Sequence, residues 1–139
     1  MGDLPLIRVL VVAYRTAATP GLLDAVRARA QRDPCSFTLL LPRPYWDPDT
    51  EEAALTLELA VPLLEDAAGS HVEGIVGESD PFLAVKQVLE RERFDEVIVS
   101  TLPEHVSQWL RRDLPHRIKE LGVPVTVVTA KRSDRSISG

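Results

Sequence analysis

The sequence is poor in the residues that would make it a disulfide-bonded, metal-binding or membrane protein. Its single cysteine, Cys35, excludes an internal disulfide. Three scattered histidines and no cysteine pair provide no metal-ligand spacing, so no metal is expected. No apolar run approaches the roughly 18 residues of a membrane span. No signal peptide is recognisable before Ile7, so we expect a cytoplasmic protein without a membrane partner.

Excess basic charge and the common phosphate-binding motifs are also missing. The net charge is -5, which argues against nucleic acid as a partner because non-specific nucleic-acid binding needs a basic face. Neither a G-x-G-x-x-G nor a Walker sequence occurs. The usual nucleotide fingerprints therefore cannot identify a ligand here.

What is present is the composition of an ordinary soluble protein. Of the 139 residues, 45% are apolar and 27% are charged. A chain of this length buries roughly 68% of the surface that its unfolded form exposes, so its hydrophobic core needs no disulfide or metal to be stable. We predict one domain over residues 1–130, followed by a polar, flexible tail over residues 131–139.

Five short apolar runs, several of them rich in β-branched residues, predict five strands. They lie at residues 7–13, 36–41, 71–76, 97–99 and 124–128. Helical segments separate each run from the next. This strict alternation predicts an α/β fold in which a doubly wound, five-stranded parallel sheet carries helices on both faces.

Four helices are expected between these strands. The first three should begin at a capping residue followed by proline, with Thr19, Asp47 and Asp80 as the caps. Asp113 is the expected cap of the last helix, after a long loop.

In the first helix, apolar residues form one stripe and the arginines should largely face water. These arginines are Arg27, Arg29 and Arg32.

Ligands of open parallel sheets bind beyond the carboxyl ends of the strands, where the winding direction reverses. The fourth strand ends in the polar pair Ser100-Thr101. Function is therefore expected in the segment that follows Thr101.

In element order and spacing over residues 7–129, the chain resembles the universal stress protein family. The segments that carry this resemblance are GESDPFLAV at 77–85, FDEVIV at 94–99 and VPVTVV at 123–128. The resemblance implies an adenine nucleotide alpha hydrolase-like fold with strand order 3-2-1-4-5. It also implies a ligand crevice between strands one and four.

The resemblance further implies a homodimer that pairs through strand five, which begins at Pro124 and ends at Val128. An unpaired edge strand carrying Val125 and Val127 would be an aggregation hazard, and pairing removes it. A homodimer is therefore the expected assembly.

The nucleotide site of the family matches less well. ATP-binding members carry an aspartate at the end of strand one, where this chain reads VAYR at 12–15. They also have a glycine-rich loop after strand four, whereas residues 100–121 contain no glycine. Converging main-chain N–H groups need residues that tolerate positive φ. Asp113, as a helix cap, would also put a carboxylate where an anion should lie.

The first hypothesis is therefore a non-enzymatic regulatory or stress-response protein that does not bind ATP in the standard mode. The alternative is a nucleotide-binding module, for ATP or AMP, with an altered site based on arginine. Arg15, Arg111 and Arg112, on which that site would be based, could instead form salt bridges to acids such as Glu104. The expected crevice residues are Tyr14, Arg15, Gly77, Ser100, Thr101, Arg111, Arg112 and Asp113.

Three other readings were open. Ser100, His105 and Asp113 could form a hydrolytic triad, although no G-x-S-x-G turn holds the serine. The acids between residues 47 and 52 could bind calcium, although acids at a helix start are favourable in any case. Trp109 is expected in the long loop, where it would plug the crevice or a subunit contact.

Overall fold

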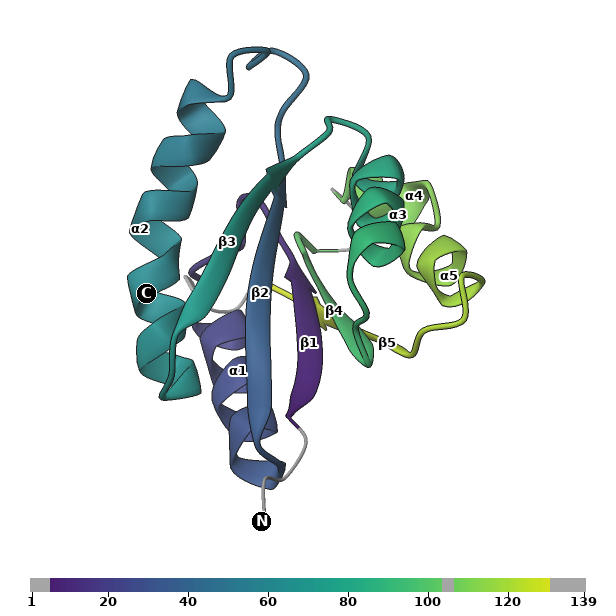
Figure 1. Ribbon diagram of the computed structural model, residues 1–139. Helices are drawn as coiled ribbons and strands as arrows, with labels where there is room; N and C mark the ends of the chain where they lie inside the picture. The colour runs from purple at the N-terminus through teal and green to yellow at the C-terminus, as the bar shows by residue number, and fades with distance from the viewer. Residues whose placement is uncertain (1–5, 104–106, 131–139) are drawn as a thin grey trace.

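A computed structural model describes residues 6–103 and 107–130 of the chain (Figure 1). Each predicted strand is present, with ends that differ by a few residues at most. The elements in chain order are β1 Ile7–Val12, α1 Pro20–Arg32, β2 Cys35–Pro42, α2 Glu51–Ala68, β3 Val72–Gly77, α3 Pro81–Arg91, β4 Glu96–Thr101, α4 Gln108–Arg111, α5 Leu114–Lys119 and β5 Val125–Thr129.

The strands form one parallel sheet in the order β3-β2-β1-β4-β5, which confirms the predicted topology. Helices α1 and α2 cover one face, and α3, α4 and α5 lie on the other (Figure 1). The sheet is therefore doubly wound. Its winding direction reverses between β1 and β4.

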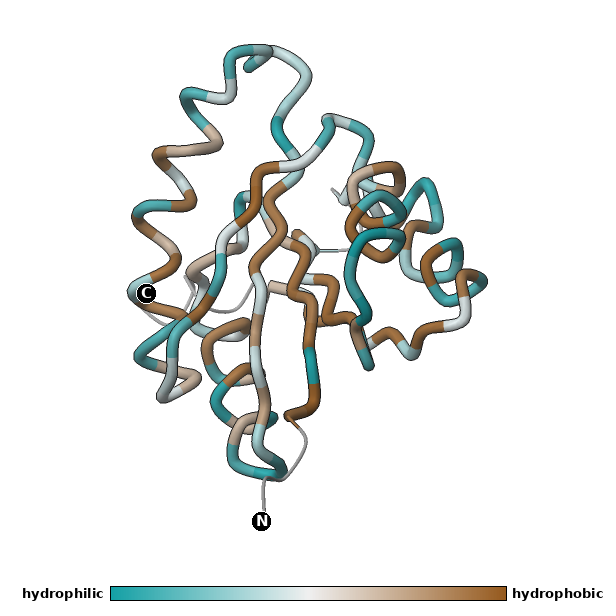
Figure 2. Tube along the Cα trace, viewed as in Figure 1, coloured by the Kyte–Doolittle hydropathy of each residue, from teal (hydrophilic) through white to brown (hydrophobic). Residues whose placement is uncertain are grey.

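The core consists of two apolar layers that share the central strand β1. Val9 and Val11 pack into the layer beneath α1 and α2. Leu10 and Val12 pack into the layer beneath α3 and α5. All four are fully buried or nearly so, and each contributes about 1.5–3 kcal/mol by leaving water. Figure 2 shows the resulting run of hydrophobic positions along the central strands.

The start of α3 confirms one of the predicted caps. The Asp80 carboxylate accepts hydrogen bonds from the N–H groups of Phe82 and Leu83, at 3.0 and 3.3 Å. Pro81 occupies the first turn of the helix, where a missing N–H costs nothing. Thr19 also stands at the predicted cap position of α1, although its hydroxyl donates to the carbonyl of Thr16 instead.

The predicted start of α2 is wrong. The helix is capped at Thr50 and begins at Glu51, after the Asp47-Pro48 pair. Asp47 still serves the helix from a distance, because its buried carboxylate accepts the N–H of Ala53 at 2.9 Å. A carboxylate that can fold back over a loop satisfies the same orphan donor as a residue at the cap position.

The long loop predicted after β4 contains a short helix, α4. The Ser107 hydroxyl starts it by accepting the N–H of Leu110 at 3.1 Å. Trp109 therefore lies on α4 and not in a loop. Asp113 does occupy the cap position of α5, but its side chain makes no capping hydrogen bond and its φ is 58°. The predicted capping bond is thus wrong.

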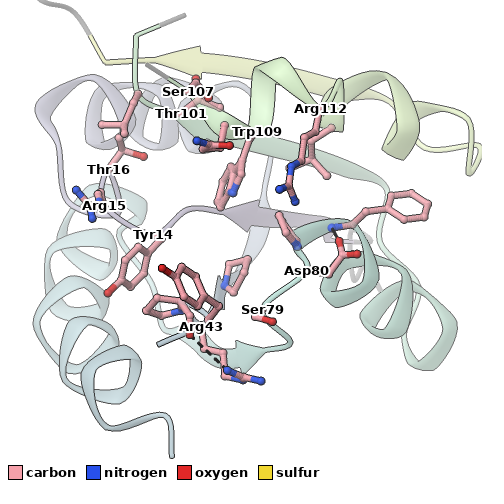
Figure 3. Close-up of a pocket in the computed structure, with 18 of the residues that line it drawn as sticks. Tyr14, Arg15, Thr16, Arg43, Ser79, Asp80, Thr101, Ser107, Trp109 and Arg112 are labelled. Atoms are coloured by element: carbon pink, nitrogen blue, oxygen red, sulfur yellow. Dashed lines mark hydrogen bonds between the residues drawn. The ribbon is translucent and has the colours of Figure 1, made fainter. Parts of the chain in front are cut away.

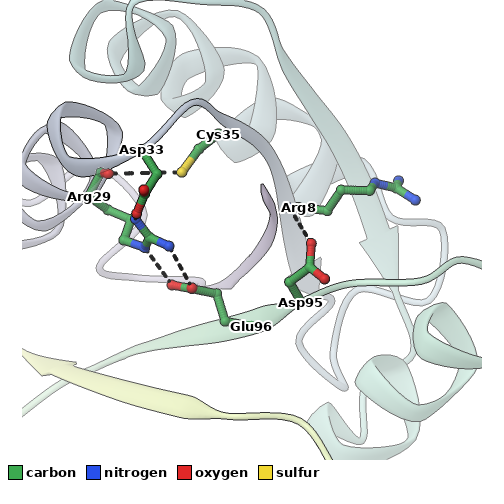
Figure 4. Close-up of polar contacts among 6 residues, drawn as sticks. All are labelled: Arg8, Arg29, Asp33, Cys35, Asp95 and Glu96. Atoms are coloured by element: carbon green, nitrogen blue, oxygen red, sulfur yellow. Dashed lines mark hydrogen bonds and ion pairs between the residues drawn. The ribbon is translucent and has the colours of Figure 1, made fainter. Parts of the chain in front are cut away.

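Arg29 of α1 is only 8% exposed, which overturns the prediction that it faces water. Its Nε and Nη2 atoms each donate to a carboxylate oxygen of Glu96 at 2.9 Å, and Nη1 reaches Asp33 at 2.9 Å (Figure 4). The hydrogen bonds to Glu96 raise the pKa of the Arg29 guanidinium further above its usual range. This forked pair ties α1 to the start of β4.

We expect Arg29→Ala to cost about 3 kcal/mol of unfolding free energy, because it strands the Glu96 carboxylate at a partly buried site. Arg27→Ala is the matched control on the same helix. It breaks only the exposed pair between Arg27 and Asp24, so about 0.5 kcal/mol is expected. Urea unfolding of both variants measures the difference. Equal losses would show that the buried pair adds nothing to the fold.

Candidate functional site

A cleft of about 800 Å³ opens at the carboxyl ends of β1, β2 and β4 (Figure 3). The loop after β1 leaves toward α1, and the chain after β4 leaves toward α4, so the two loops separate at this edge. Segments at the start of α3 and along α4 and α5 close the remaining sides. The cleft therefore lies where the winding direction of the sheet reverses, which is where ligands bind in open parallel sheets.

The floor of the cleft is formed by buried hydroxyl groups. Ser100 and Thr101 end β4, and Thr16 follows β1; all three are almost fully buried. The hydroxyls of Thr16 and Ser100 share a hydrogen bond of 2.5 Å across the gap between the strands. The Thr101 hydroxyl donates to that of Thr129 on β5 at 3.4 Å. The floor is thus polar, and its hydroxyls are engaged in two separate hydrogen-bonded pairs.

Four arginines give the cleft its charge. Arg117 of α5 lies over the ring of Phe82, with its guanidinium carbon 4.2 Å from the ring centroid. Arg15 lies beside Thr16 on one side of the cleft, and Arg112 lies beside Trp109 on another (Figure 3). Over the described residues, neither Arg15 nor Arg112 forms an ion pair. The lining arginines are Arg15, Arg43, Arg112 and Arg117.

Negative charge in the lining is slight by comparison. Within the described chain, Asp80 is the acid that lines the cleft. Its carboxylate is engaged by the N–H groups at the start of α3. The four guanidinium groups therefore make the cleft locally basic in a protein of net charge -5.

Aromatic rings contribute much of the apolar surface of the cleft. Trp109 packs against the apolar layer beneath α3 and α5 and projects into the cleft (Figure 3). Tyr45 and Trp46, in the loop between β2 and α2, meet edge to face with centroids 5.1 Å apart. Both are exposed on the rim. Flat rings beside guanidinium groups suit a ligand that has an aromatic part and an anionic part.

Tyr14 joins the cleft to the first turn of α2, because its hydroxyl donates to the Glu52 carboxylate. Trp46 Nε1 donates to the other oxygen of Glu52 at 3.2 Å. Burial, and then the hydrogen bond and charge of Glu52, raise the pKa of Tyr14 from 10.0 to about 12. The phenol is therefore neutral and held in place at physiological pH.

The structure brings five of the eight expected site residues to the cleft, and the other three lie outside its lining. Those that line it are Tyr14, Arg15, Ser100, Thr101 and Arg112. Arg111 and Asp113 belong to the same segment but are not part of the lining.

Gly77, the third residue outside the lining, is explained by packing. A Cβ added there would lie 2.9 Å from Ala84 Cβ and from Leu40 Cδ1. The end of β3 therefore approaches α3 too closely for a side chain, and this packing accounts for the glycine.

Several lining residues were not among the predicted site residues, and four of them carry the charge and the rings of the cleft. Arg43, Tyr45 and Trp46 follow β2 directly, so the rule that ligands meet the carboxyl ends of strands could have found them. Arg117 lies on α5, and nothing in the sequence separates it from any surface arginine. It enters the cleft because α5 packs beside α3.

The described residues give little support to the hydrolytic triad or to the calcium site. His105 of the hydrolytic triad lies outside the described residues, and the Ser100 hydroxyl is paired with Thr16. Within the described chain, no group of three or more histidine, cysteine or acidic residues could hold a metal ion. Asp47, from the proposed calcium cluster, accepts a main-chain N–H instead. Among the described helices, none has the length and apolar character needed to cross a membrane.

Together, these features define a doubly wound α/β protein with a basic, aromatic-lined cleft at its topological switch point. Neither a protein-family profile nor a curated protein sequence matches the chain. Solved structures do match, and universal stress proteins are among them, which confirms the predicted resemblance at the level of fold.

The universal stress protein from Archaeoglobus fulgidus aligns over 88% of this chain and 93% of its own, with 14% identity and a TM-score of 0.62. Its complex with dAMP aligns over 89% of this chain and 98% of its own, with 17% identity and a TM-score of 0.63. A universal stress protein in complex with cAMP aligns over 89% and 97%, with 16% identity and a TM-score of 0.60. At these identities, the likeness establishes the fold alone.

The ionisation of Tyr14 tests the link between the cleft and α2. In a Tyr45→Phe background, Tyr14 is the only tyrosine, and its phenolate should appear with a midpoint near pH 12 in ultraviolet difference spectra. Adding Glu52→Gln should lower that midpoint toward 10.0 without reaching it, because burial remains. Since the folded-state pKa is raised, the stability that Tyr14 contributes is present below pH 10 and lost as the pH rises through 12. An unchanged midpoint in the Glu52 variant would contradict the contact.

Proposed function

We propose that this protein is a non-enzymatic, ligand-binding regulatory protein with the universal stress protein fold. Its ligand is an anion with a flat aromatic part, and an adenine mononucleotide is the first such molecule to test. The observation that carries the proposal is the set of four arginines around an aromatic-lined cleft at the switch point. Guanidinium forks hold phosphate without any main-chain contribution.

The segment after β4 favours this arginine-based site over a standard triphosphate site. Residues 100–121 contain no glycine, and Pro103 has no N–H to donate. The helices α4 and α5 are short, and the Ser107 hydroxyl already accepts one of the first N–H groups of α4. Few main-chain donors are left to converge on a polyphosphate. One phosphate between two guanidinium groups makes no such demand.

The rings in the cleft and the solved relatives favour a nucleotide over a simple anion. Trp109 offers an apolar face beside Arg112, and stacking on a base is worth about 1–3 kcal/mol. Two structures with this fold were solved with dAMP and with cAMP, each of which carries a single phosphate. These neighbours support a mononucleotide as the ligand class.

Binding without catalysis is the role that the polar groups of the floor support. The Ser100 hydroxyl is buried, and its hydrogen-bond partner among the described residues is the Thr16 hydroxyl. The Asp80 carboxylate accepts two main-chain N–H groups and is committed to α3. A general base must lie within hydrogen-bond reach of the proton that it removes, and within the described chain no carboxylate or imidazole is hydrogen-bonded to the Ser100 hydroxyl.

Isothermal titration calorimetry with AMP, cAMP and ATP tests the binding proposal. We expect about micromolar affinity for a mononucleotide and no gain from the extra phosphates of ATP. Arg112→Ala and Arg15→Ala should each weaken binding about tenfold or more, because each removes a charge-assisted hydrogen bond. Arg32→Ala, on the outer end of α1, is the matched control and should leave the affinity unchanged. No heat with any nucleotide, or tighter binding of ATP that survives Arg112→Ala, would overturn the proposal.

We also propose that the protein acts as a homodimer through β5. This strand is an edge of the sheet, and Val127 on it is 41% exposed. Sedimentation equilibrium at micromolar concentration should give twice the chain mass. Val127→Lys should give the monomer, because a charge on an edge strand opposes pairing. A wild-type monomer, or a dimer that persists in the variant, would contradict this assembly.

A further inference from the structure

The outer face of α2 carries a row of exposed leucines. Leu55, Leu59 and Leu63 are 58%, 67% and 45% exposed. They follow one another at intervals of four residues, so they form one stripe about 12 Å long on the solvent side of the helix. The opposite side of α2, with Ala53, Ala60 and Leu64, packs into the core. Hydrophobic positions therefore recur along both sides of this helix (Figure 2).

Such a stripe is not needed for the helix to form. Core packing already holds α2 in place, and glutamate or lysine at the exposed positions would favour the helix about as well as leucine. Single exposed leucines are common on protein surfaces, but a continuous apolar row on a helix marks a contact surface. The row lies within α2, away from the lining of the cleft.

The charges of α2 indicate what covers this row. The helix contains five acidic residues, which are Glu51, Glu52, Glu58, Glu65 and Asp66, and no lysine, arginine or histidine. Within the described chain, Glu51, Glu58 and Asp66 form no ion pair. Asp66 lies in the last turn, where the helix dipole disfavours negative charge. A cation from outside the chain would therefore be favourable beside Glu58 and Asp66.

We propose that the α2 face, defined by Leu55, Leu59 and Leu63 with their acidic flanks, docks an amphipathic helix of a partner protein. The partner helix presents an apolar stripe flanked by lysine or arginine. Its apolar residues pack on the leucine row, and its cations pair with Glu58 and Asp66. This is the helix-recognition mode in which anchors at intervals of three and four residues meet an apolar surface.

Charge argues against two other occupants, which are α2 of a second copy and an anionic membrane. A second copy of α2 would bring a helix with five acids and no base against another of the same kind. An anionic membrane surface would repel the same acids, since lipid binding by helices relies on basic residues. The basic amphipathic helix is the occupant that satisfies both the leucines and the acids.

Fluorescence anisotropy with two labelled peptides tests this surface. Both are amphipathic helices of about 18 residues with the same leucine stripe; one is flanked by lysine and the other by glutamate. The basic peptide should bind the full-length protein and weaken as salt is raised. Leu59→Asp and Glu58→Lys should each weaken it about tenfold or more. Leu121→Asp, at an exposed leucine outside α2, is the matched control and should bind like the wild type.

The outcomes separate the occupants. Because Leu59 is largely exposed, circular dichroism should show Leu59→Asp folded, and Leu55→Gln serves as a milder second variant. Equal binding of the basic peptide by wild type and both leucine variants would overturn the proposal, as would equal binding of the acidic peptide. Sedimentation in which Leu59→Asp lowers the mass, while Val127→Lys does not, would assign the face to a second copy. Partition onto phosphatidylglycerol vesicles that Leu59→Asp abolishes would assign it to a membrane.

Discussion

From Val9 to Val12, β1 is hydrogen-bonded to a strand on each edge and covered by an apolar layer on each face, so these four positions leave little room for substitution. From this strand the chain winds toward β2 on one side, and β4 winds toward β5 on the other. The loops that leave β1 and β4 must therefore separate. The cleft is the space that they leave, and the hydrogen bond between Thr16 and Ser100 closes its floor. The depth and the polarity of the site both follow from this one strand.

Polar contacts at the other end of the strands hold α1, β1 and β4 in place. Arg29 and Glu96 fasten α1 beneath the amino end of β4, and the N–H of Arg8 bonds to the Asp95 carboxylate at 2.8 Å beside them (Figure 4). These contacts lie at the edge of the sheet opposite the cleft. Cleft residues can then vary without loss of the fold, because the contacts that hold the fold lie elsewhere.

Predictions from local sequence were correct where a residue acts on its immediate neighbours in the chain. Asp80 caps α3 as expected, because a carboxylate two residues before a free N–H needs no other part of the fold. Asp47 failed as a cap because its carboxylate reaches the same kind of N–H from six residues away, across a loop. The prediction that Arg29 faces water was wrong because its partner, Glu96, is remote in sequence and becomes adjacent only after folding.

The spacing of apolar runs by itself predicted five parallel strands, and from these the carboxyl edge of the sheet as the place for a cleft, since these depend on periodicity and on the handedness of crossovers. The order of the strands came from the family resemblance. Tertiary structure alone decided which side chains meet at that edge. Arg117 reaches the cleft because α5 packs beside α3, and position 77 requires glycine because the end of β3 lies close to Ala84. Such meetings depend on distances between segments far apart in the chain, and no local pattern of residues encodes those distances.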